Sequence, residues 1–87
     1  MVTMYSTPWC GYCRRLKSQM EREGIEYTVI DIEENPEAAK FVMEANGGNQ
    51  TVPTVTIPTK SGETVTMTNP TIVQVREALE KIGRAHV

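Results

Sequence analysis

The sequence of 87 residues predicts an α/β fold in which a four-stranded mixed sheet is flanked by three helices. Segments rich in β-branched and aromatic residues alternate with segments whose apolar residues recur every three or four positions. The second β-rich segment follows the first helical one after a single turn, as in a βαβ unit with parallel strands. The last two β-rich segments are joined by a loop short enough for a hairpin, so these strands should pair antiparallel.

The first half of the chain predicts the βαβ unit. Residues 2–5 form a strand that ends at Ser6-Thr7-Pro8, and a helix runs from Gly11 to a C-terminal stop at Gly24. The apolar positions of this helix are Cys13, Leu16 and Met20. Residues 26–32 then provide a second strand, parallel to the first.

A second helix is predicted after this strand, with Asn35 as N-cap, Pro36 as first helical residue and an end at Asn46-Gly47-Gly48. Both glycines serve the loop that follows. The acids around the start of this helix are interpreted as solvated carboxylates and not as metal ligands. They are Asp31, Glu33, Glu34 and Glu37.

The second half predicts a hairpin and a final helix. The strands are residues 52–57 and 63–67, and Asn69-Pro70 repeats the cap-plus-proline pattern before a helix that ends at Gly83. Ile72, Val75, Leu79 and Ile82 mark its apolar face. Residues 1–83 are therefore expected to form a single domain, and residues 84–87 a frayed tail.

Composition narrows the class of protein. A net charge of −2, with 39% apolar and 23% charged residues, is ordinary for a globular domain and argues against a nucleic-acid partner. No apolar run is long enough to span a bilayer, and no secretory signal is visible at Met1. We therefore expect a cytoplasmic monomer, in a compartment where a C-x-x-C pair is more often catalytic than structural.

Cys10 and Cys13 are the only cysteines, and they lie where the first strand gives way to the first helix. The unpaired N–H groups of a helix start favour a thiolate, which is the nucleophile of disulfide exchange. Cys10 is the expected nucleophile at an exposed helix start, and Arg14 and Arg15 are expected to add positive charge. A structural disulfide would close too short a ring to stabilise much, and a zinc site lacks ligands because His86 stands alone.

The element order and the C-x-x-C motif resemble the thioredoxin superfamily and, within it, the glutaredoxins, over residues 1 to about 82. A second shared motif is Thr51-Val52-Pro53, which resembles the T-V-P element of the family. The resemblance implies a thioredoxin/glutaredoxin fold with a cis Pro53 beside the cysteines. It also implies that the backbone of Val52 pairs with a bound thiol like an added strand.

One segment departs from the usual glutaredoxin pattern. Where glutaredoxins carry a G-G-x-D-D element that holds glutathione, this chain has Thr68-Asn69-Pro70-Thr71. The combination of W-C-G-Y-C, G-G-N-Q-T-V-P-T-V and T-N-P is similar to the mycoredoxins of actinobacteria. Those proteins use mycothiol, a cysteine carried on an uncharged pseudodisaccharide. The resemblance implies mycothiol as co-substrate and no tightly bound cofactor.

Hydroxyl and amide groups suit such a ligand better than paired charges. The expected substrate-binding residues are Tyr12, Gln50, Thr51, Val52, Pro53, Thr68 and Asn69, and Asn49 could add a further amide. Trp9 is expected to pack and fix the loop before Cys10. Tyr12, between the cysteines, is expected to line the substrate groove.

The predicted function is a thiol–disulfide oxidoreductase that removes mycothiol from proteins, with Cys10 as nucleophile and Cys13 as the resolving thiol. Its partners would be mycothiolated or disulfide-containing proteins, mycothiol and, indirectly, mycothiol disulfide reductase. Three alternatives stay open: a glutathione-dependent glutaredoxin, an electron donor to ribonucleotide reductase, and a dimer that binds a [2Fe–2S] cluster through Cys10 and an external thiol.

Overall fold

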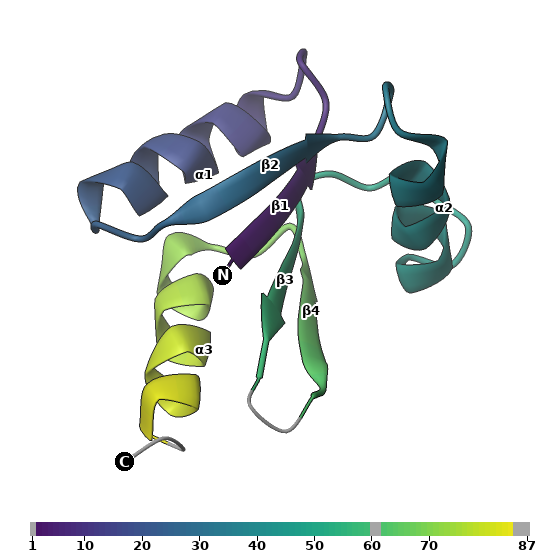
Figure 1. Ribbon diagram of the computed structural model, residues 1–87. Helices are drawn as coiled ribbons and strands as arrows, with labels where there is room; N and C mark the ends of the chain where they lie inside the picture. Colours follow the sequence, from purple (N-terminus) through teal and green to yellow (C-terminus); the bar gives the residue numbers. More distant parts are fainter. Residues whose placement is uncertain (1, 60–61, 85–87) are drawn as a thin grey trace.

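The computed structural model describes residues 2–59 and 62–84 and contains the predicted strands and helices in the predicted order. The elements are β1 (Val2–Ser6), α1 (Gly11–Arg22), β2 (Tyr27–Asp31), α2 (Pro36–Ala45), β3 (Thr54–Pro58), β4 (Thr64–Thr68) and α3 (Ile72–Arg84). They form one four-stranded sheet in the order β2-β1-β3-β4. β1 is parallel to β2, and the β1–β3 and β3–β4 pairs are antiparallel, which confirms the predicted mixed sheet (Figure 1).

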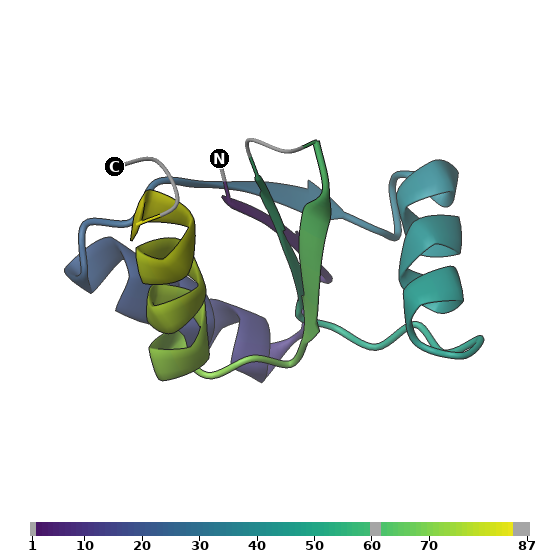
Figure 2. The ribbon, with the colours of Figure 1, turned by 90° about the horizontal axis from the view of Figure 1, so that it is seen from below.

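The helices lie on both faces of the sheet. Figure 2 shows α1 and α3 on one side and α2 on the other. The larger core cluster lies between the sheet and the α1–α3 side, and both cysteines belong to it. Its buried members are Val2, Met4, Cys10, Cys13, Leu16, Met20, Val55, Ile57 and Val75. The redox motif is therefore part of the main core.

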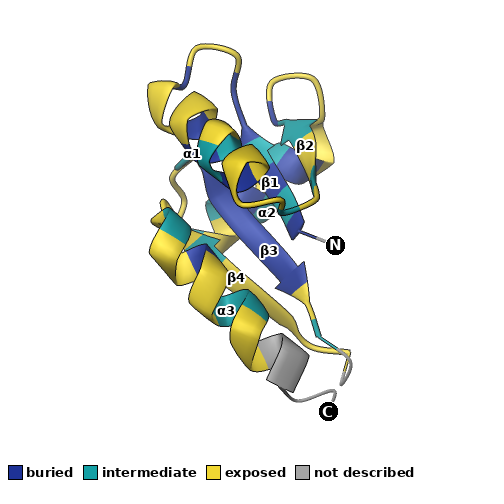
Figure 3. Cartoon of the chain, turned by 90° about the vertical axis from the view of Figure 1, so that its left-hand side faces the viewer, coloured by how far each residue is buried: buried dark blue, intermediate teal, exposed yellow. Residues whose placement is uncertain are grey.

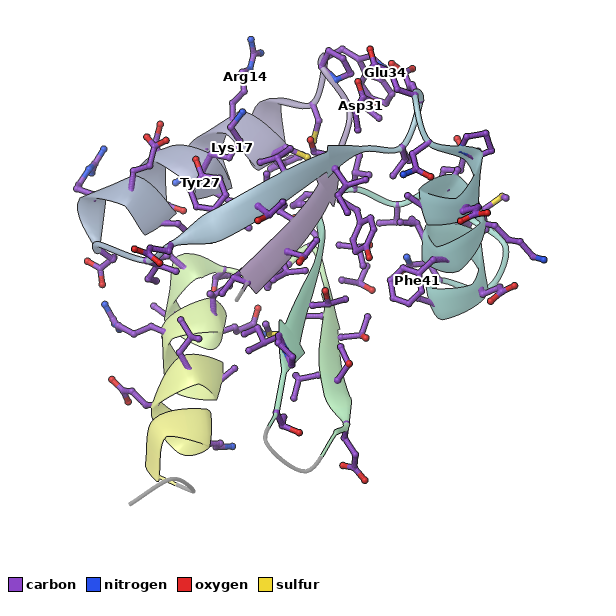
Figure 4. All side chains as sticks on the ribbon, in the orientation of Figure 1. Arg14, Lys17, Tyr27, Asp31, Glu34 and Phe41 are labelled. Atoms are coloured by element: carbon purple, nitrogen blue, oxygen red, sulfur yellow. The ribbon has the colours of Figure 1, made fainter. Side chains whose placement is uncertain are left out.

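The smaller core cluster is built around α2. Ala38 and Val42 of that helix pack with Ile32, and the rings of Tyr5 and Phe41 lie 5.1 Å apart between their centroids. Figure 4 shows Phe41 on the side of α2 that faces the sheet. Aromatic pairs at this separation add to the stabilisation from burial alone. This contact helps hold α2 against the sheet.

The central strand β3 is the most deeply buried part of the sheet, as its continuous dark blue ribbon in Figure 3 indicates. Residues 54–57 are all buried, because β3 lies between two other strands and under helices on both faces. The edge strand β4 is mostly exposed. The start of β3, where the predicted T-V-P element ends, is thus held rigidly by its surroundings.

Several local predictions at the ends of the helices are confirmed. Asn35 caps α2 with its side chain, which accepts a hydrogen bond from the N–H of Ala38 at 3.1 Å, and Pro36 is the first helical residue. Gly24, Gly47 and Gly48 have positive φ values of 72°, 67° and 98°. Such values suit glycine, which lacks the Cβ that makes the left-handed region costly.

The predicted start of the last helix is wrong. Asn69 is not its cap, because its φ of 46° is left-handed and its N–H donates to the carbonyl of Pro53 at 2.7 Å. The helix starts two residues later with a capping box. The Gln74 N–H donates to Thr71 Oγ1 at 3.1 Å, and the Thr71 N–H donates to Gln74 Oε1 at 2.8 Å. Asn69 and Pro70 instead join β4 to the helix.

Each strand also differs from its predicted bounds by one or two residues at one or both ends, and two boundary differences have a clear cause. β3 begins at Thr54 and not at Val52, because the carbonyls of Val52 and Pro53 bond to groups outside the sheet. α3 continues past Gly83 to Arg84, since a glycine lowers helix propensity by only about 1 kcal/mol and does not by itself end a helix. The rest of the predicted tail, residues 85–87, lies outside the described residues.

The cap of α2 gives a prediction about stability. Asn35→Ala should lower the free energy of unfolding by about 1 kcal/mol, because the N–H of Ala38 loses its acceptor. Urea unfolding should show a lower midpoint with an unchanged slope. Asn35→Asp keeps an acceptor oxygen and should stay near the parent stability. An Asn35→Ala variant as stable as the parent would contradict the cap.

Candidate active site

Cys10 is the N-cap residue of α1, and two hydrogen bonds hold its sulfur. The N–H of Cys13 donates to Cys10 Sγ at 3.1 Å, and the Cys10 thiol donates to the carbonyl of Val52 at 3.9 Å. The first N–H groups of a helix have no acceptor within the helix and carry its positive dipole end. A negative charge on the Cys10 sulfur is therefore stabilised by the helix that it caps.

The expectation that Cys10 lies exposed is wrong. Only 5% of the residue is accessible, because its role as N-cap turns the sulfur inward over the first turn of α1 and toward Val52. Trp9, just before the motif, and Tyr12, between the two cysteines, are by contrast 68% and 67% exposed.

Cys13 is even more enclosed, with 2% of the residue accessible. Burial, together with a side-chain hydrogen bond to Cys10 and the charge of Cys10, raises the pKa of the Cys13 thiol to about 12. A backbone hydrogen bond from Thr7 and the charge of Lys17 lower the pKa by smaller amounts. Cys13 thus remains a protonated thiol at neutral pH, and both cysteines are free in the structure.

The two arginines after the motif act at a distance. Arg14 and Arg15 are both exposed, and Figure 4 shows Arg14 directed away from the sheet. Solvent and salt screen charges in such positions. The positive end of α1 and the Cys13 N–H are therefore the main stabilisers of a thiolate at Cys10.

The T-V-P element lies beside the cysteines as predicted, and the Val52–Pro53 peptide bond is cis. The Val52 carbonyl accepts from the Cys10 thiol, and the Pro53 carbonyl accepts from the Asn69 N–H. Pro53 is buried, whereas Val52 is half-buried. Two residues of the expected site, Val52 and Asn69, are thus joined to each other and to Cys10 through backbone groups.

Trp9 does not pack into the core, so that part of the prediction is wrong. Its ring is exposed, and the indole Nε1–H donates to Glu33 Oε2 at 3.1 Å. Glu33 lies in the connection between β2 and α2. The loop before Cys10 is therefore tied to the neighbouring loop by one exposed hydrogen bond.

A hollow of about 310 Å³ opens between the start of α1 and the start of α3. The residues that line it are Tyr12, Arg15, Gln19, Asn69, Pro70 and Thr71. Tyr12 and Asn69 were predicted from the sequence as substrate-binding residues. Arg15 and Gln19 were missed, although the spacing of Tyr12, Arg15 and Gln19 by three and four places them on one face of the helix.

The other predicted binding residues have different neighbours. Gln50 Nε2 lies 3.9 Å from Met43 Sδ, and the Thr51 carbonyl accepts from Thr54 Oγ1 at 2.8 Å. Thr68 donates its hydroxyl to the side-chain oxygen of Asn46. None of the three is among the residues that line the hollow. Asn49 likewise bonds to Asn46, through the backbone carbonyl, at 3.3 Å.

Across residues 2–59 and 62–84, no group of three or more His, Cys, Asp or Glu side chains lies close enough together to hold a metal ion. His86, the other ligand type considered from the sequence, lies outside these residues. In the same part of the chain, no helix is both long and apolar enough to cross a membrane.

The fold and the site define a thiol–disulfide oxidoreductase: a C-x-x-C motif caps the first helix of a mixed sheet, beside a proline turn that contacts the nucleophilic sulfur. The glutaredoxin family profile matches residues 2–61, and the chain belongs to the glutaredoxin family.

Relatives of similar length support this assignment. A Mycobacterium tuberculosis protein provisionally assigned to the glutaredoxins is 48% identical over 94% of this chain and 93% of its own. Mycoredoxin 1 of Corynebacterium glutamicum is 37% identical over 94% of this chain and 96% of its own. The crystal structure of glutaredoxin C1 from a poplar hybrid superposes with a TM-score of 0.60 at 26% identity, over 88% of this chain and 74% of that one.

The raised pKa of Cys13 gives a prediction about its reactivity. Only the thiolate reacts with iodoacetamide, so below a pKa of about 12 the labelling rate should rise tenfold with each pH unit. In a Cys10→Ser variant, burial, the largest cause of the shift, remains. We expect Cys13 in that variant to show no plateau up to pH 10.

The measurement is intact mass after timed labelling between pH 6 and pH 10. The matched Cys13→Ser variant carries only the capped Cys10 sulfur and should be labelled much faster at pH 7. A plateau for Cys13 at or below pH 9, the ordinary value for a thiol, would contradict the role of burial.

Proposed function

We propose that this oxidoreductase removes mycothiol from mixed disulfides with proteins and uses free mycothiol as its co-substrate, with no tightly bound cofactor. The observation that carries the proposal is the composition of the hollow beside Tyr12. It supplies an exposed aromatic ring, two side-chain amides, a hydroxyl and one guanidinium. Such groups suit an uncharged ligand that is rich in hydroxyls.

Charge argues against glutathione at the same place. Glutathione carries an ammonium group and two carboxylates, and its ammonium needs an acidic partner. None of the residues that line the hollow is acidic, and Arg15 is the one cation among them. A desolvated ammonium without a partner would lower the affinity for glutathione. The similarity to mycoredoxin 1 over 94% of the chain supports the same choice.

The first step is the attack of the Cys10 thiolate on the mycothiol sulfur of a protein–mycothiol disulfide. A Cys10–mycothiol disulfide forms, and the protein thiolate leaves and takes up a proton. A second mycothiol thiolate then attacks the mycothiol sulfur of this adduct. Mycothiol disulfide is released, and the Cys10 thiolate is regenerated. Overall, the protein sulfur is reduced and the sulfur of the second mycothiol is oxidised, while the first mycothiol sulfur passes from one disulfide to another.

Cys13 provides a second route when no free thiol arrives. Its sulfur lies against Cys10 and would attack Cys10 Sγ, which releases the mycothiol thiolate and closes the Cys10–Cys13 disulfide. Because its pKa is about 12, Cys13 must first lose its proton, and the departing mycothiol thiolate can accept one. This route should therefore be slower than resolution by abundant mycothiol.

The two roles predict different outcomes for the two serine variants. Cys10→Ser should lose all activity, because the nucleophile is gone. Cys13→Ser should still remove mycothiol from proteins, since a second mycothiol resolves the adduct. With free mycothiol withheld, Cys13→Ser should accumulate a Cys10–mycothiol adduct that intact mass spectrometry detects. An adduct on Cys10→Ser, or none on Cys13→Ser, would reverse the assignment.

The choice of thiol predicts a preference between two adducts of the same peptide. The mycothiolated peptide, with mycothiol as reductant, should be reduced with a kcat/KM at least roughly tenfold above that of the glutathionylated peptide with glutathione, since tenfold corresponds to about 1.4 kcal/mol. Each reaction is followed by release of the peptide thiol. Faster turnover of the glutathione adduct would refute the proposal of mycothiol.

A charge variant provides the matched control for this comparison. Asn69→Asp places a carboxylate in the hollow at a position whose left-handed φ of 46° aspartate tolerates. This variant should reduce the difference in kcat/KM between the two adducts by improving turnover of the glutathione adduct. An unchanged difference would show that the hollow does not select the thiol.

A further inference from the structure

The side chain of Asn46 joins α2, β3 and β4. Asn46 caps the C-terminal end of α2. Its Nδ2 donates to the Val42 carbonyl at 2.7 Å and to Thr54 Oγ1 at 3.2 Å, and its Oδ1 accepts from the hydroxyl of Thr68. Thr54 is the first residue of β3, and Thr68 is the last of β4.

Every polar atom of this amide is used, and the partners fix its orientation. The Val42 carbonyl can only accept, so the nitrogen of the amide must face it, and the oxygen must then face Thr68. Thr54 and Thr68 are directly opposite each other in the β3–β4 ladder. The amide therefore bonds to both members of one cross-strand pair from the end of the helix.

The network continues from Thr54 into the proline turn. Thr54 has no accessible surface, and its hydroxyl, which accepts from Asn46, donates to the Thr51 carbonyl at 2.8 Å. Thr51 is followed directly by Val52, whose carbonyl accepts from the Cys10 thiol. On the other side, Thr68 is followed by Asn69, whose N–H donates to the Pro53 carbonyl. Both ends of the network therefore adjoin backbone groups of the active site.

Asn46 itself contacts neither sulfur and does not line the hollow. It tethers the segments that carry Val52 and Asn69 to the rigid start of β3. Thr54 is buried, Asn46 is half-buried and Thr68 is exposed. Hydrogen-bond networks in which every group is satisfied hold their members in one arrangement. Loss of the amide removes one hydrogen bond from the Thr54 hydroxyl and one from the Val42 carbonyl, which still accepts from the backbone N–H at position 46. The turn then loses its link to the end of α2.

From these contacts we propose that Asn46 is a positioning residue for the thiol–disulfide reaction. Through Thr54 and Thr68 it fixes the Val52 turn and Asn69 in the geometry that receives a mixed disulfide, while the reactivity of Cys10 is set independently by α1. The role belongs to the family activity and holds whichever low-molecular-weight thiol the protein uses.

The test compares Asn46→Ala and Thr54→Val with the parent protein on mycothiolated and glutathionylated forms of one peptide. In both variants KM should rise roughly tenfold with kcat changed less than about threefold, the loss expected when one or two partly buried hydrogen bonds that order a binding surface are removed. The fold increase in KM over the parent should be the same for the mycothiol and the glutathione adduct. The test therefore stands even if the protein shows no preference for mycothiol.

Two control variants distinguish a positioning role of Asn46 from a general loss of stability. Asn35→Ala removes the cap at the opposite end of the same helix, so it should lower stability without changing KM. Thr54→Ser keeps the hydroxyl and should keep KM within about twofold of the parent. Labelling of Cys10 by iodoacetamide, which needs no docking surface, should proceed at the parent rate in Asn46→Ala and Thr54→Val.

An unchanged KM in folded Asn46→Ala or Thr54→Val would overturn the proposal. A fall in Cys10 labelling that parallels the loss of turnover would also overturn it, because the amide would then act on the nucleophile itself. If Asn46→Ala does not fold, Thr54→Val decides, since valine matches the shape of the buried threonine and removes only its hydrogen bonds.

Discussion

The hydrogen bond from the Cys13 N–H to the Cys10 sulfur is the interaction on which the site depends. It exists because Cys10 occupies the cap position of α1, where a serine or aspartate would ordinarily accept from the same N–H. The cap turns the sulfur inward, places it within reach of the Val52 carbonyl and brings Cys13 onto the buried face of the helix. One local interaction thus supplies both the stabilised nucleophile and the enclosed second thiol.

The difference between the two cysteines follows from their positions along one helical turn. Cys10 faces the N–H groups at the helix start, whereas Cys13 lies among apolar side chains that raise its pKa to about 12. The low exposure of Cys10 does not conflict with its role as nucleophile, because the Cys13 N–H takes the place of water as a hydrogen-bond donor to its sulfur. At Cys13, burial outweighs the backbone hydrogen bond from Thr7, so that thiol stays protonated.

Sequence patterns predicted the sheet, the three helices and the cysteine motif because each rests on local periodicity or on a cap within a few residues. Asn35 was read correctly for this reason, and Asn69 was misread because two similar Asn-Pro pairs serve different structures. At Asn69, the backbone bond to Pro53 comes from a contact 16 positions away that no local pattern encodes. The T-x-x-Q capping box at Thr71 was available in the sequence and would have given the correct start.

The nucleophilic sulfur and the proposed ligand site occupy different parts of this molecule. The Cys10 sulfur lies between the start of α1 and the Val52 carbonyl, whereas the hollow that we propose for the rest of a thiol ligand is shared by α1 and the segment before α3. The hydrogen bond from the Asn69 N–H to the Pro53 carbonyl connects the two parts. Asn46 bonds to Thr54 and Thr68, the residues next to Pro53 and Asn69, and so links both partners of that hydrogen bond to the end of α2. Under the proposed function, a change of residues in the hollow would alter which thiol is accepted while the capped cysteine keeps its reactivity.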